Sequence, residues 1–408
     1  IKLVSYGNEY SDLPYFLEDM VGLRIKEAMN KRPLIGVSPY KTVRCATDVL
    51  QRYHYSLQQL PFCGRIEEMN QLRNFLDKDQ KFLWWAITGQ AGAGKSRLAL
   101  ELLKRSTGSW FGFFINDKAT QEDFDSFEPF NNTVIVIDYV AGREGFVANA
   151  IRSIKEKFEN VDYKARILLL ERENSRIGKY DSYDLKSTEY ENYFLNLGDL
   201  DKASVEILIK EVMNQRGIEA ADTVAYELCE AYGKKYEKLQ FRPLFVQIFV
   251  EAWIENDFQL PRYDKFEELL QRLLEREQER WLEILDNDQV CCNAFIRLLL
   301  RANISGKLQP DNMPSYYQDD WYIVNSFLQN HSFPGKQREE EKKAIFATIC
   351  QNLDENSVEI EPLYPDLIKE YMFCFYMDDS RLPGVLNELW QNEASKFSTF
   401  ITRSLTDF

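Results

Sequence analysis

Short apolar runs alternate with amphipathic stretches between residues 82 and 197. In the intervals, apolar residues recur at helical spacing, for example from Phe146 to Phe158. Strands that are apolar along their whole length are typical of parallel sheets covered by helices on both faces. The pattern therefore predicts an α/β fold with a parallel sheet and helices on both of its faces. The predicted strands are Phe82–Ile87, Trp110–Ile115, Thr133–Ile137, Ala165–Leu170 and Leu195–Leu197.

After residue 200 the pattern becomes helical. One apolar stripe runs from Val205 to Met213, and a longer one runs from Phe266 to Leu285. Stripes of this kind mostly pack a core, so we expect a helical region after the sheet. No apolar run approaches the roughly 20 residues that span a bilayer, and no secretory signal opens the chain. We expect a cytoplasmic protein that does not bind membranes.

Composition narrows the function classes. The 408 residues carry a net charge of −15, which opposes broad binding to nucleic acid because such binding needs a basic surface. The seven cysteines form no paired framework, and only two histidines are present, His54 and His331. We therefore expect reduced thiols, no metal site beyond one for Mg²⁺, and no nucleic-acid partner.

Residues 89–96 read GQAGAGKS, which is the pattern of a phosphate-binding loop (P-loop). The loop follows an apolar run and precedes the helix-forming stretch RLALELLKR, the order of strand, loop and helix that the pattern requires. Glycines let backbone N–H groups approach phosphate oxygens, and the helix N-terminus adds a positive dipole. Lys95 supplies a charge for the β- and γ-phosphates, and the Ser96 hydroxyl binds Mg²⁺. The candidate phosphate-binding residues are Gly89, Gly92, Ala93, Gly94, Lys95, Ser96 and Arg97.

A carboxylate, Asp138, follows the third predicted strand. In P-loop enzymes an acid at this place holds the Mg²⁺ shell through water, and we expect Asp138 to do so from a strand directly beside the P-loop strand. Many such ATPases carry a second acid immediately afterwards to polarise the attacking water, but this chain has Tyr139. The nearest acid is Glu144, which is the candidate catalytic base; the alternative is that it only begins a helix. The missing second acid suggests slow hydrolysis.

Two further cofactor-binding candidates lie later in the chain. Arg172 follows the fourth predicted strand, where a cation can reach the γ-phosphate; the alternative is a surface arginine paired with Glu171 or Glu173. Pro243 precedes the apolar stretch LFVQIFVEAW, and a proline at the start of a helix is also common for purely structural reasons.

Together these residues resemble the signal-transduction ATPases with numerous domains (STAND), a class of P-loop NTPases that includes the NB-ARC and NACHT modules of immune receptors and bacterial antiphage relatives. The segment FCGRIEEMNQL looks like the start of the family's domain, which implies that Phe62, Gly64 and Arg65 lie against the adenine. LLLERE, with Arg172, looks like its sensor strand. RPLF resembles the element whose proline packs on the base, with Arg242 replacing the usual glycine. The implied cofactors are ATP or ADP and Mg²⁺.

The resemblance also divides the chain into domains. It implies a P-loop NTPase domain at residues 58–198, a helical lid domain at 199–260, and a winged-helix-like domain at 261–378 that contains IEPLYPDLIKEYMF. Residues 379–408 look like the start of a helical repeat or sensor region. We expect residues 1–57 to be the tail of an upstream domain plus a connector, and their opening resembles the last strand and helix of sirtuin-like domains in bacterial defence proteins.

The function implied by this resemblance is that of a molecular switch in bacterial antiphage immunity. ATP bound between the sheet domain and the helical lid is expected to hold one arrangement of the chain. A trigger, such as a phage protein sensed outside this chain, then permits assembly into a homo-oligomer that activates an effector. Two alternatives stay open: a remodelling ATPase of the AAA+ type with continuous hydrolysis, and a winged-helix regulator that binds DNA.

Overall fold

The computed structural model divides the chain into two compact units. Among the described residues, the first unit contains Gly36 and Val37, those from 55 to 211, and the short segment Phe241–Leu244. The second contains Tyr53, those from 212 to 240, and those from 245 onward. The opening of the chain that resembles the last strand and helix of sirtuin-like domains lies outside the described residues. The structure describes residues 60–330 and 365–407, except 116–118, 139, 141–142, 173–176, 178–193, 220–221, 237–240, 307, 309–312 and 377–381, together with Gly36, Val37, Tyr53, Tyr55, Gln58, Ile360, Pro362 and Leu363.

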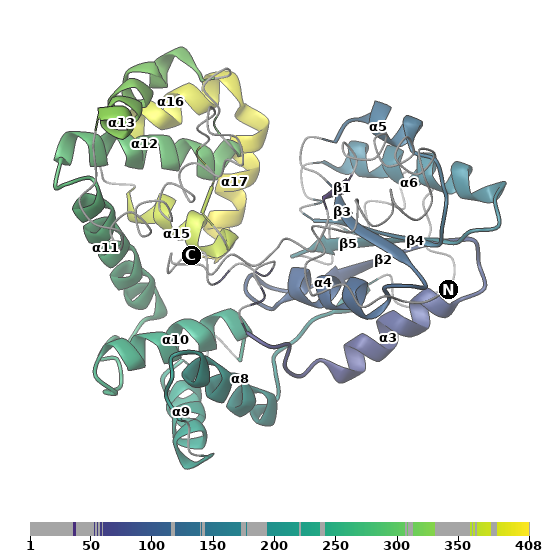
Figure 1. Cartoon of the computed structure of the whole chain (residues 1–408), viewed down its shortest axis with the longest axis horizontal. Coiled ribbons are helices and arrows are strands. Elements are labelled where there is room, and N and C mark those ends of the chain that lie inside the picture. Colours follow the sequence, from purple (N-terminus) through teal and green to yellow (C-terminus); the bar gives the residue numbers. More distant parts are fainter. Residues whose placement is uncertain are drawn as a thin grey trace. The chain divides into compact units, whose positions relative to one another are not determined.

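A six-stranded sheet forms the centre of the first unit (Figure 1). Five of the strands run parallel, and β1 pairs antiparallel with β3 at one edge. The order across the sheet is β1-β3-β4-β5-β2-β6. All five strands predicted from the sequence are confirmed, with ends that differ by one residue at most. The bounds are β1 Gly36–Val37, β2 Phe82–Thr88, β3 Phe111–Ile115, β4 Thr133–Ile137, β5 Ala165–Glu171 and β6 Phe194–Asn196.

The prediction that the Asp138 strand lies directly beside the P-loop strand is wrong. β4 pairs with β3 and β5, whereas the P-loop strand β2 pairs with β5 and β6, so β5 lies between them. The physical reason is that, after β4, the chain crosses over and forms β5 in the middle of the sheet, between β4 and β2. Which strands pair depends on long-range packing, not on a local sequence pattern. The carboxyl ends of all these parallel strands still meet at one edge.

Side chains of the strands alternate between two cores, one on each face of the sheet. Helices α3 (Ile66–Asp77) and α4 (Lys95–Arg105) cover one face, and α5 (Gln121–Ser126) and α6 (Glu144–Glu159) cover the other (Figure 1). The prediction of helices on both faces is therefore confirmed. On β2, the residues Leu83, Trp85 and Ile87 belong to the first core, and Trp84 and Ala86 belong to the second.

Arg166, near the amino end of β5, is fully buried and anchors the edge of the sheet away from the P-loop. Its guanidinium donates hydrogen bonds to carbonyls of the last turn of α3, of the segment after α3, and of β5 itself. The last carbonyls of a helix have no partner within the helix. The dipoles of the accepting carbonyls also offset part of the cost of burying the charged guanidinium. The accepting carbonyls belong to Phe75, Leu76, Lys78, Gln80 and Ala165, at distances of 2.5–3.2 Å.

The second unit is helical in its described part, as the apolar stripes predicted. The stripe from Phe266 to Leu285 is buried at most of its apolar positions. Two helices, α8 (Lys202–Gln215) and α10 (Pro243–Glu255), begin in the first unit and end in the second. The remaining helices are α9 Asp222–Lys235, α11 Phe266–Ile284, α12 Gln289–Ser305, η7 Ser315–Tyr317, α13 Gln318–Asn330, α15 Asp366–Phe375, α16 Leu382–Asn392 and α17 Ala394–Asp407.

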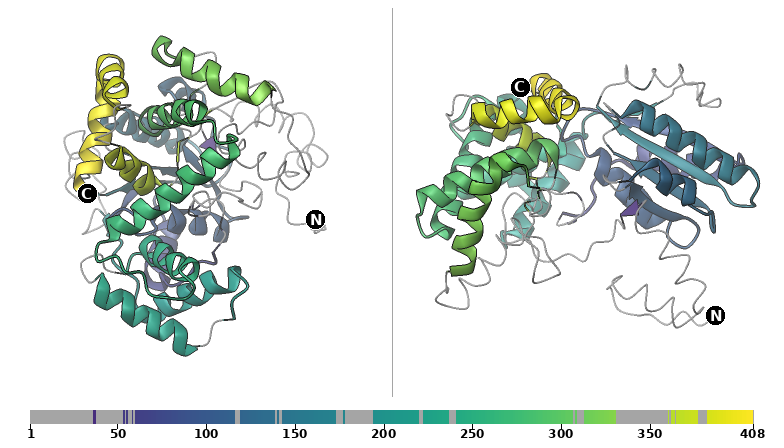
Figure 2. Two further views of the ribbon diagram at one scale, coloured as in Figure 1. Left: turned by 90° about the vertical axis from the view of Figure 1, so that its left-hand side faces the viewer. Right: turned by 90° about the horizontal axis from the view of Figure 1, so that it is seen from above.

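Helix α12 lies at the centre of the second unit, packed against α13, α15, α16 and α17 (Figure 2). Its buried Arg301 pairs with Glu388 of α16 at 3.0 Å and with Glu393. Within the described residues, an isolated antiparallel bridge joins Leu308 to Ile360. The winged-helix-like nature of residues 261–378 stays a prediction, because residues 331–359 lie outside the described part.

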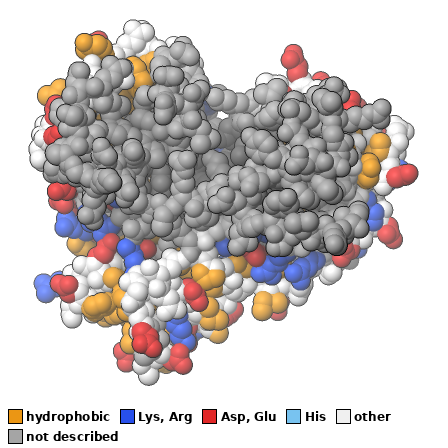
Figure 3. Space-filling view, in the orientation of Figure 1, with side chains coloured by type: hydrophobic (Ala, Val, Ile, Leu, Met, Phe, Trp, Pro, Cys, Tyr) orange, Lys and Arg blue, Asp and Glu red, His pale blue; other side chains and the backbone are white. Residues whose placement is uncertain are grey.

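The surface charge and the length of the helices show which kinds of partner the described residues suit. Over its described part, the face drawn in Figure 3 is mixed in charge, with Lys and Arg side chains among Asp and Glu side chains. None of the helices within the described residues combines the length and the apolar character needed to cross a membrane.

Candidate nucleotide-binding site

The P-loop joins β2 to α4 at the carboxyl edge of the sheet, and its glycines adopt conformations that other residues rarely take. The φ angles are +154° at Gly89, +77° at Gly92 and +93° at Gly94. At Gly89 an added Cβ would also lie 2.7 Å from the carbonyl oxygen of Leu197. The glycines that the motif requires are therefore needed here for the loop's shape and for the close passage of the backbone.

Loop carbonyls accept hydrogen bonds from within the loop and from the start of α10. The Lys95 ammonium donates to the carbonyls of Gly89, at 2.6 Å, and Gln90, at 3.1 Å. The Leu244 backbone N–H donates to the carbonyl of Gly92, at 3.4 Å. The charge of Lys95 thus stays at the loop, where the motif places the cation that binds phosphates.

Two buried arginines bind the remaining loop carbonyls. Arg65 donates to the carbonyl of Ala93 at 3.2 Å, and Arg242 donates to the carbonyl of Ala91 at 3.0 Å. Every carbonyl from residue 89 to residue 93 therefore accepts a hydrogen bond. These donors occupy the negative ends of the loop dipoles and place two further cations beside the loop, an arrangement that favours an anion at the loop's N–H groups.

The magnesium candidates Ser96 and Asp138 lie together in the structure. The Ser96 hydroxyl, in the first turn of α4, donates to Asp138 Oδ2 at 2.7 Å. A hydroxyl and a carboxylate are hard oxygen ligands of the kind that Mg²⁺ takes, usually with water and substrate phosphates completing its shell. The two residues therefore fit a magnesium ion, and when bound it would neutralise phosphate charge.

Arg65 joins the P-loop to the segment that follows β6. Besides Ala93, its guanidinium donates to the carbonyls of Gly198, at 2.6 Å, and Asp199, at 3.3 Å, and pairs with Glu68 at 2.9 Å. Burial raises the pKa of the Asp199 carboxyl, and a backbone hydrogen bond and the two nearby arginines oppose that rise. Arg65 thus helps to hold the conformation of the P-loop.

Gly64 precedes Arg65 with a φ of +66° and passes close to the start of α8. A Cβ at this position would lie 2.7 Å from Ser204 Oγ. Only glycine allows this approach without displacing α8. The placement of Gly64 and Arg65 against adenine stays a prediction.

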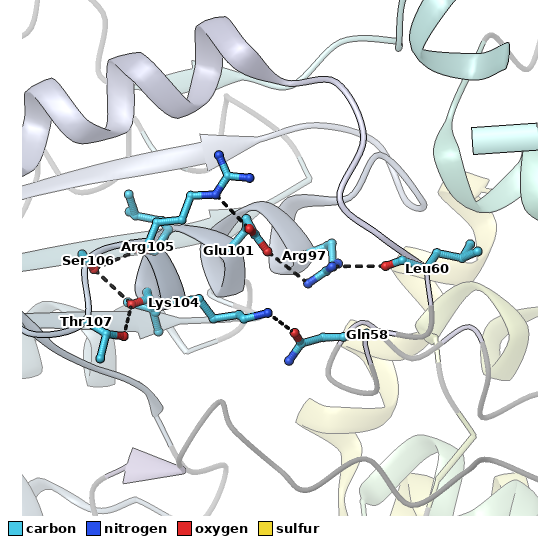
Figure 4. A network of polar contacts seen from close by, with 10 residues as sticks. Gln58, Leu60, Arg97, Glu101, Lys104, Arg105, Ser106 and Thr107 are labelled. Atoms are coloured by element: carbon cyan, nitrogen blue, oxygen red, sulfur yellow. Dashed lines mark hydrogen bonds and ion pairs between the residues drawn. The ribbon is translucent and has the colours of Figure 1, made fainter. Parts of the chain in front are cut away.

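Arg97 anchors the segment before α3 onto α4 (Figure 4). The Arg97 guanidinium donates to the Leu60 carbonyl at 3.2 Å and pairs with Glu101 at 3.6 Å. It also lies 5.8 Å from the centre of the Phe62 ring, with the Arg105 guanidinium 5.5 Å from the same ring. Burial lowers the pKa of the Arg97 guanidinium. These contacts account for both side chains structurally, and their roles in nucleotide binding stay predictions.

Arg172 lies at the carboxyl edge of the sheet, directly after β5. Its backbone N–H donates to Glu171 Oε1 at 2.6 Å, and the first P-loop residue, Gly89, donates its N–H to the Glu171 carbonyl at 3.2 Å. Arg172 thus directly follows a residue that contacts the P-loop, and its sensor role stays a prediction. The structure also draws attention to Glu171, which sequence reasoning considered only as a surface partner of Arg172; the signal was an acid that ends an otherwise apolar strand.

Pro243 and Glu144 both begin helices. Pro243 is the first residue of α10, and its Cγ lies 3.9 Å from where a Cβ of Gly94 would be, so it borders the P-loop. Glu144 is the first residue of α6, a position that agrees with both interpretations of that residue, so its catalytic role stays a prediction. Arg242, noted in the sequence only as a departure from the family, is a loop contact that sequence reasoning missed.

Comparison with known proteins finds similar folds. No family model and no curated protein matches the chain. The chain is structurally similar, at low identity, to solved P-loop ATPases. The Walker-type ATPase Paby2304 of Pyrococcus abyssi is 12% identical over 76% of this chain and 96% of that chain, with a TM-score of 0.34. Cdc6p of Pyrobaculum aerophilum is 10% identical over 85% and 99%, at 0.35. The ORC2 protein of Aeropyrum pernix is 12% identical over 78% and 95%, at 0.38.

These values are too low to transfer a function or a residue role to this chain. The nucleotide site is instead defined by the P-loop between β2 and α4, the Ser96–Asp138 pair, and the parallel sheet whose carboxyl edge carries both. These features together are those of a P-loop NTPase fold.

Proposed function

We propose that this chain is an ATP-binding switch of the STAND type, in which Mg²⁺–ATP at the P-loop controls assembly into a homo-oligomer. The observation that carries the proposal is the P-loop itself, with every carbonyl from residue 89 to residue 93 bound by a donor and Lys95 held at the loop. The contact between Ser96 and Asp138 supports a magnesium ion as part of the ligand.

The segment before α10 supports a link between the nucleotide and the helical unit. Arg242 and Leu244 both donate hydrogen bonds to P-loop carbonyls. Helix α10 starts at this segment and continues into the second unit. A phosphate that shifts the P-loop would therefore act directly on the first turn of α10, and a ligand can favour only the arrangement in which it binds more tightly.

Slow turnover suits a switch, because a bound nucleotide must persist long enough to hold one state. The residue after Asp138 is Tyr139, where many ATPases have a second acid. The role in antiphage immunity, the phage-derived trigger and the upstream effector are parts of the proposal that rest on the family resemblance. So do the domain bounds assigned from the sequence.

The test is substitution of the P-loop lysine. Lys95→Ala removes the charge that faces the phosphates, and we expect the affinity for Mg²⁺–ATP to fall at least about 100-fold, which corresponds to roughly 3 kcal/mol. Assembly should be lost with it. Calorimetry measures the affinity, and particle-mass measurement measures assembly. The matched control is Lys155→Ala, which removes an exposed lysine on α6. An alanine variant that assembles with ATP like the parent would refute the proposal.

Turnover separates the switch from a remodelling ATPase. Steady-state hydrolysis faster than about 1 s⁻¹ that Glu144→Gln abolishes would favour continuous remodelling. Slow hydrolysis with assembly dependent on nucleotide favours the switch.

A further inference from the structure

Glu171, the last residue of β5, is a buried acid that no structural contact fully explains. Its side chain is 5% exposed. One carboxylate oxygen, Oε1, accepts a hydrogen bond from the Arg172 backbone N–H at 2.6 Å. The other, Oε2, has no hydrogen-bond partner among the described residues. A buried carboxylate oxygen without a partner is costly, so its retention needs a reason.

Strand register places Glu171 beside the P-loop. Glu171 pairs with Thr88, the last residue of β2, and its carbonyl accepts the Gly89 N–H. Thr88 is itself fully buried, and its hydroxyl likewise has no partner within the described part of the chain. Two buried side chains, each with one oxygen that lacks a partner among the described residues, therefore share one row at the carboxyl edge of the sheet, next to the phosphate-binding loop.

The same register relates Glu171 to the magnesium strand. On its other side β5 pairs with β4, and the last pair joins Ile137 to Leu169. Because side chains alternate between faces, Leu169 and Glu171 lie on the same face of β5, with Glu171 one row further towards the carboxyl edge. Glu171 thus ends the strand that lies between the P-loop strand and the strand leading to Asp138.

This position lies one strand away from the place where the sequence lacks a second acid. A second acid directly after Asp138 would stand at the end of β4, but residue 139 is a tyrosine. An acid at the end of β5 is displaced by one strand spacing, about 4.8 Å, towards the P-loop. We propose that Glu171 is the catalytic carboxylate that orients and deprotonates the water attacking bound ATP.

The reaction needs only water as a co-reactant. A water molecule that donates a hydrogen bond to Glu171 Oε2 attacks the γ-phosphorus of ATP. A bond forms between the water oxygen and this phosphorus, and the bond between the phosphorus and the bridging oxygen of ADP breaks. The water proton passes to Glu171 and then to the phosphate product, so ADP and inorganic phosphate leave and the Glu171 carboxylate is regenerated. The assignment rests on the proposed function, since it requires ATP at the P-loop.

Glu171→Gln tests the assignment with little change of shape. The glutamine side-chain oxygen can still accept the Arg172 N–H, so the local fold is expected to persist, but an amide cannot take a proton. We expect the dissociation constant for Mg²⁺–ATP to stay within about threefold of the parent and the single-turnover rate of γ-phosphate release to fall at least about 100-fold. The matched control is Glu156→Gln, the same substitution on the exposed face of α6, which should leave the rate unchanged.

Each outcome separates this assignment from the proposed switch. A parent that does not bind ATP overturns both. If the parent binds ATP but does not hydrolyse it, only the catalytic assignment is wrong. The same holds if the parent and Glu171→Gln hydrolyse ATP at the same rate. If the glutamine variant does not fold by circular dichroism, Glu171→Asp decides: it keeps the carboxylate but withdraws it by one methylene. If Glu171→Asp binds Mg²⁺–ATP like the parent but hydrolyses it roughly tenfold more slowly, the assignment is supported. An unchanged hydrolysis rate in Glu171→Asp overturns it.

Discussion

Arg65→Ala is the most informative single change, because this residue binds the P-loop without belonging to it. The buried guanidinium donates to the carbonyls of Ala93, Gly198 and Asp199 and pairs with Glu68. Truncation leaves these acceptors without their donor and opens the space that the side chain filled. Residue 65 has a left-handed backbone conformation, φ +61°. Arginine and alanine both carry a Cβ, so the substitution does not change the backbone strain at this position.

The expected losses of stability and of nucleotide affinity follow from the individual contacts of Arg65. A hydrogen bond to a charged group contributes about 1.5–3 kcal/mol. Arg65 is almost fully buried, so solvent screens its bonds little. The two bonds of the Nη2 group, to Ala93 and Gly198, therefore predict a loss of at least about 3 kcal/mol in the free energy of unfolding. Only the Ala93 bond lies within the P-loop, so about 1.5–3 kcal/mol should appear in binding, a 10- to 150-fold weaker affinity for Mg²⁺–ATP.

Urea unfolding without nucleotide and calorimetry with Mg²⁺–ATP measure the two losses separately. Arg65→Lys should fall between parent and alanine, because an ammonium cannot bridge two carbonyls with a planar fork. The exposed Arg73→Ala on α3 controls for the loss of one positive charge and should change stability by less than about 0.5 kcal/mol. If Arg65→Ala binds nucleotide within threefold of the parent, the idea that this arginine shapes the P-loop is wrong.

Three further changes test the site and the fold. Asp138→Asn keeps a hydrogen-bonding partner for Ser96 but removes the charge, so titration with and without Mg²⁺ should show at least roughly tenfold weaker binding of ATP only when Mg²⁺ is present. Gly89→Ala forces a Cβ to within 2.7 Å of the Leu197 carbonyl oxygen, and thermal unfolding should reveal a loss of about 1–3 kcal/mol. Arg166→Met removes the donor to five carbonyls, and urea unfolding should show a loss of at least about 3 kcal/mol.

Controls distinguish these three effects. For Arg166→Met the nucleotide affinity of the folded protein should match the parent, since Arg166 lies at the opposite edge of the sheet from the P-loop; a large affinity loss would contradict this separation. Equal weakening of ATP binding with and without Mg²⁺ in Asp138→Asn would argue against its magnesium role. A Gly89→Ala protein as stable as the parent would show that the loop can shift away from Leu197.

Much of the fold was readable in the chain because its signals are local. Apolar runs such as Thr133–Ile137 have the length and composition of buried strands, and the structure gives that strand the same bounds. The P-loop motif depends on a fixed spacing of glycines, and the positive φ values of Gly89, Gly92 and Gly94 are the conformations that such a spacing serves. The apolar stripe of α11 likewise became a buried helix face.

The order of the strands and the partners of charged side chains were decided only in three dimensions. Strand pairing joins residues far apart in the chain, so no local pattern placed β5 between β2 and β4. Arg242 looked like a lost glycine, yet its bond to the Ala91 carbonyl crosses 151 positions of sequence. Glu171 looked like a surface acid beside Arg172, and only the register with Thr88 showed that it is buried below the loop.

The amino-acid sequence by itself determined that a loop at residues 89–96 is shaped for phosphate, because glycine conformation and helix-end polarity are local properties of the chain. The tertiary structure decided which cations hold that loop and which acids stand at its edge. Those contacts depend on packing between segments that are far apart in the sequence. A different strand order would give the strands and the loops that follow them different neighbours.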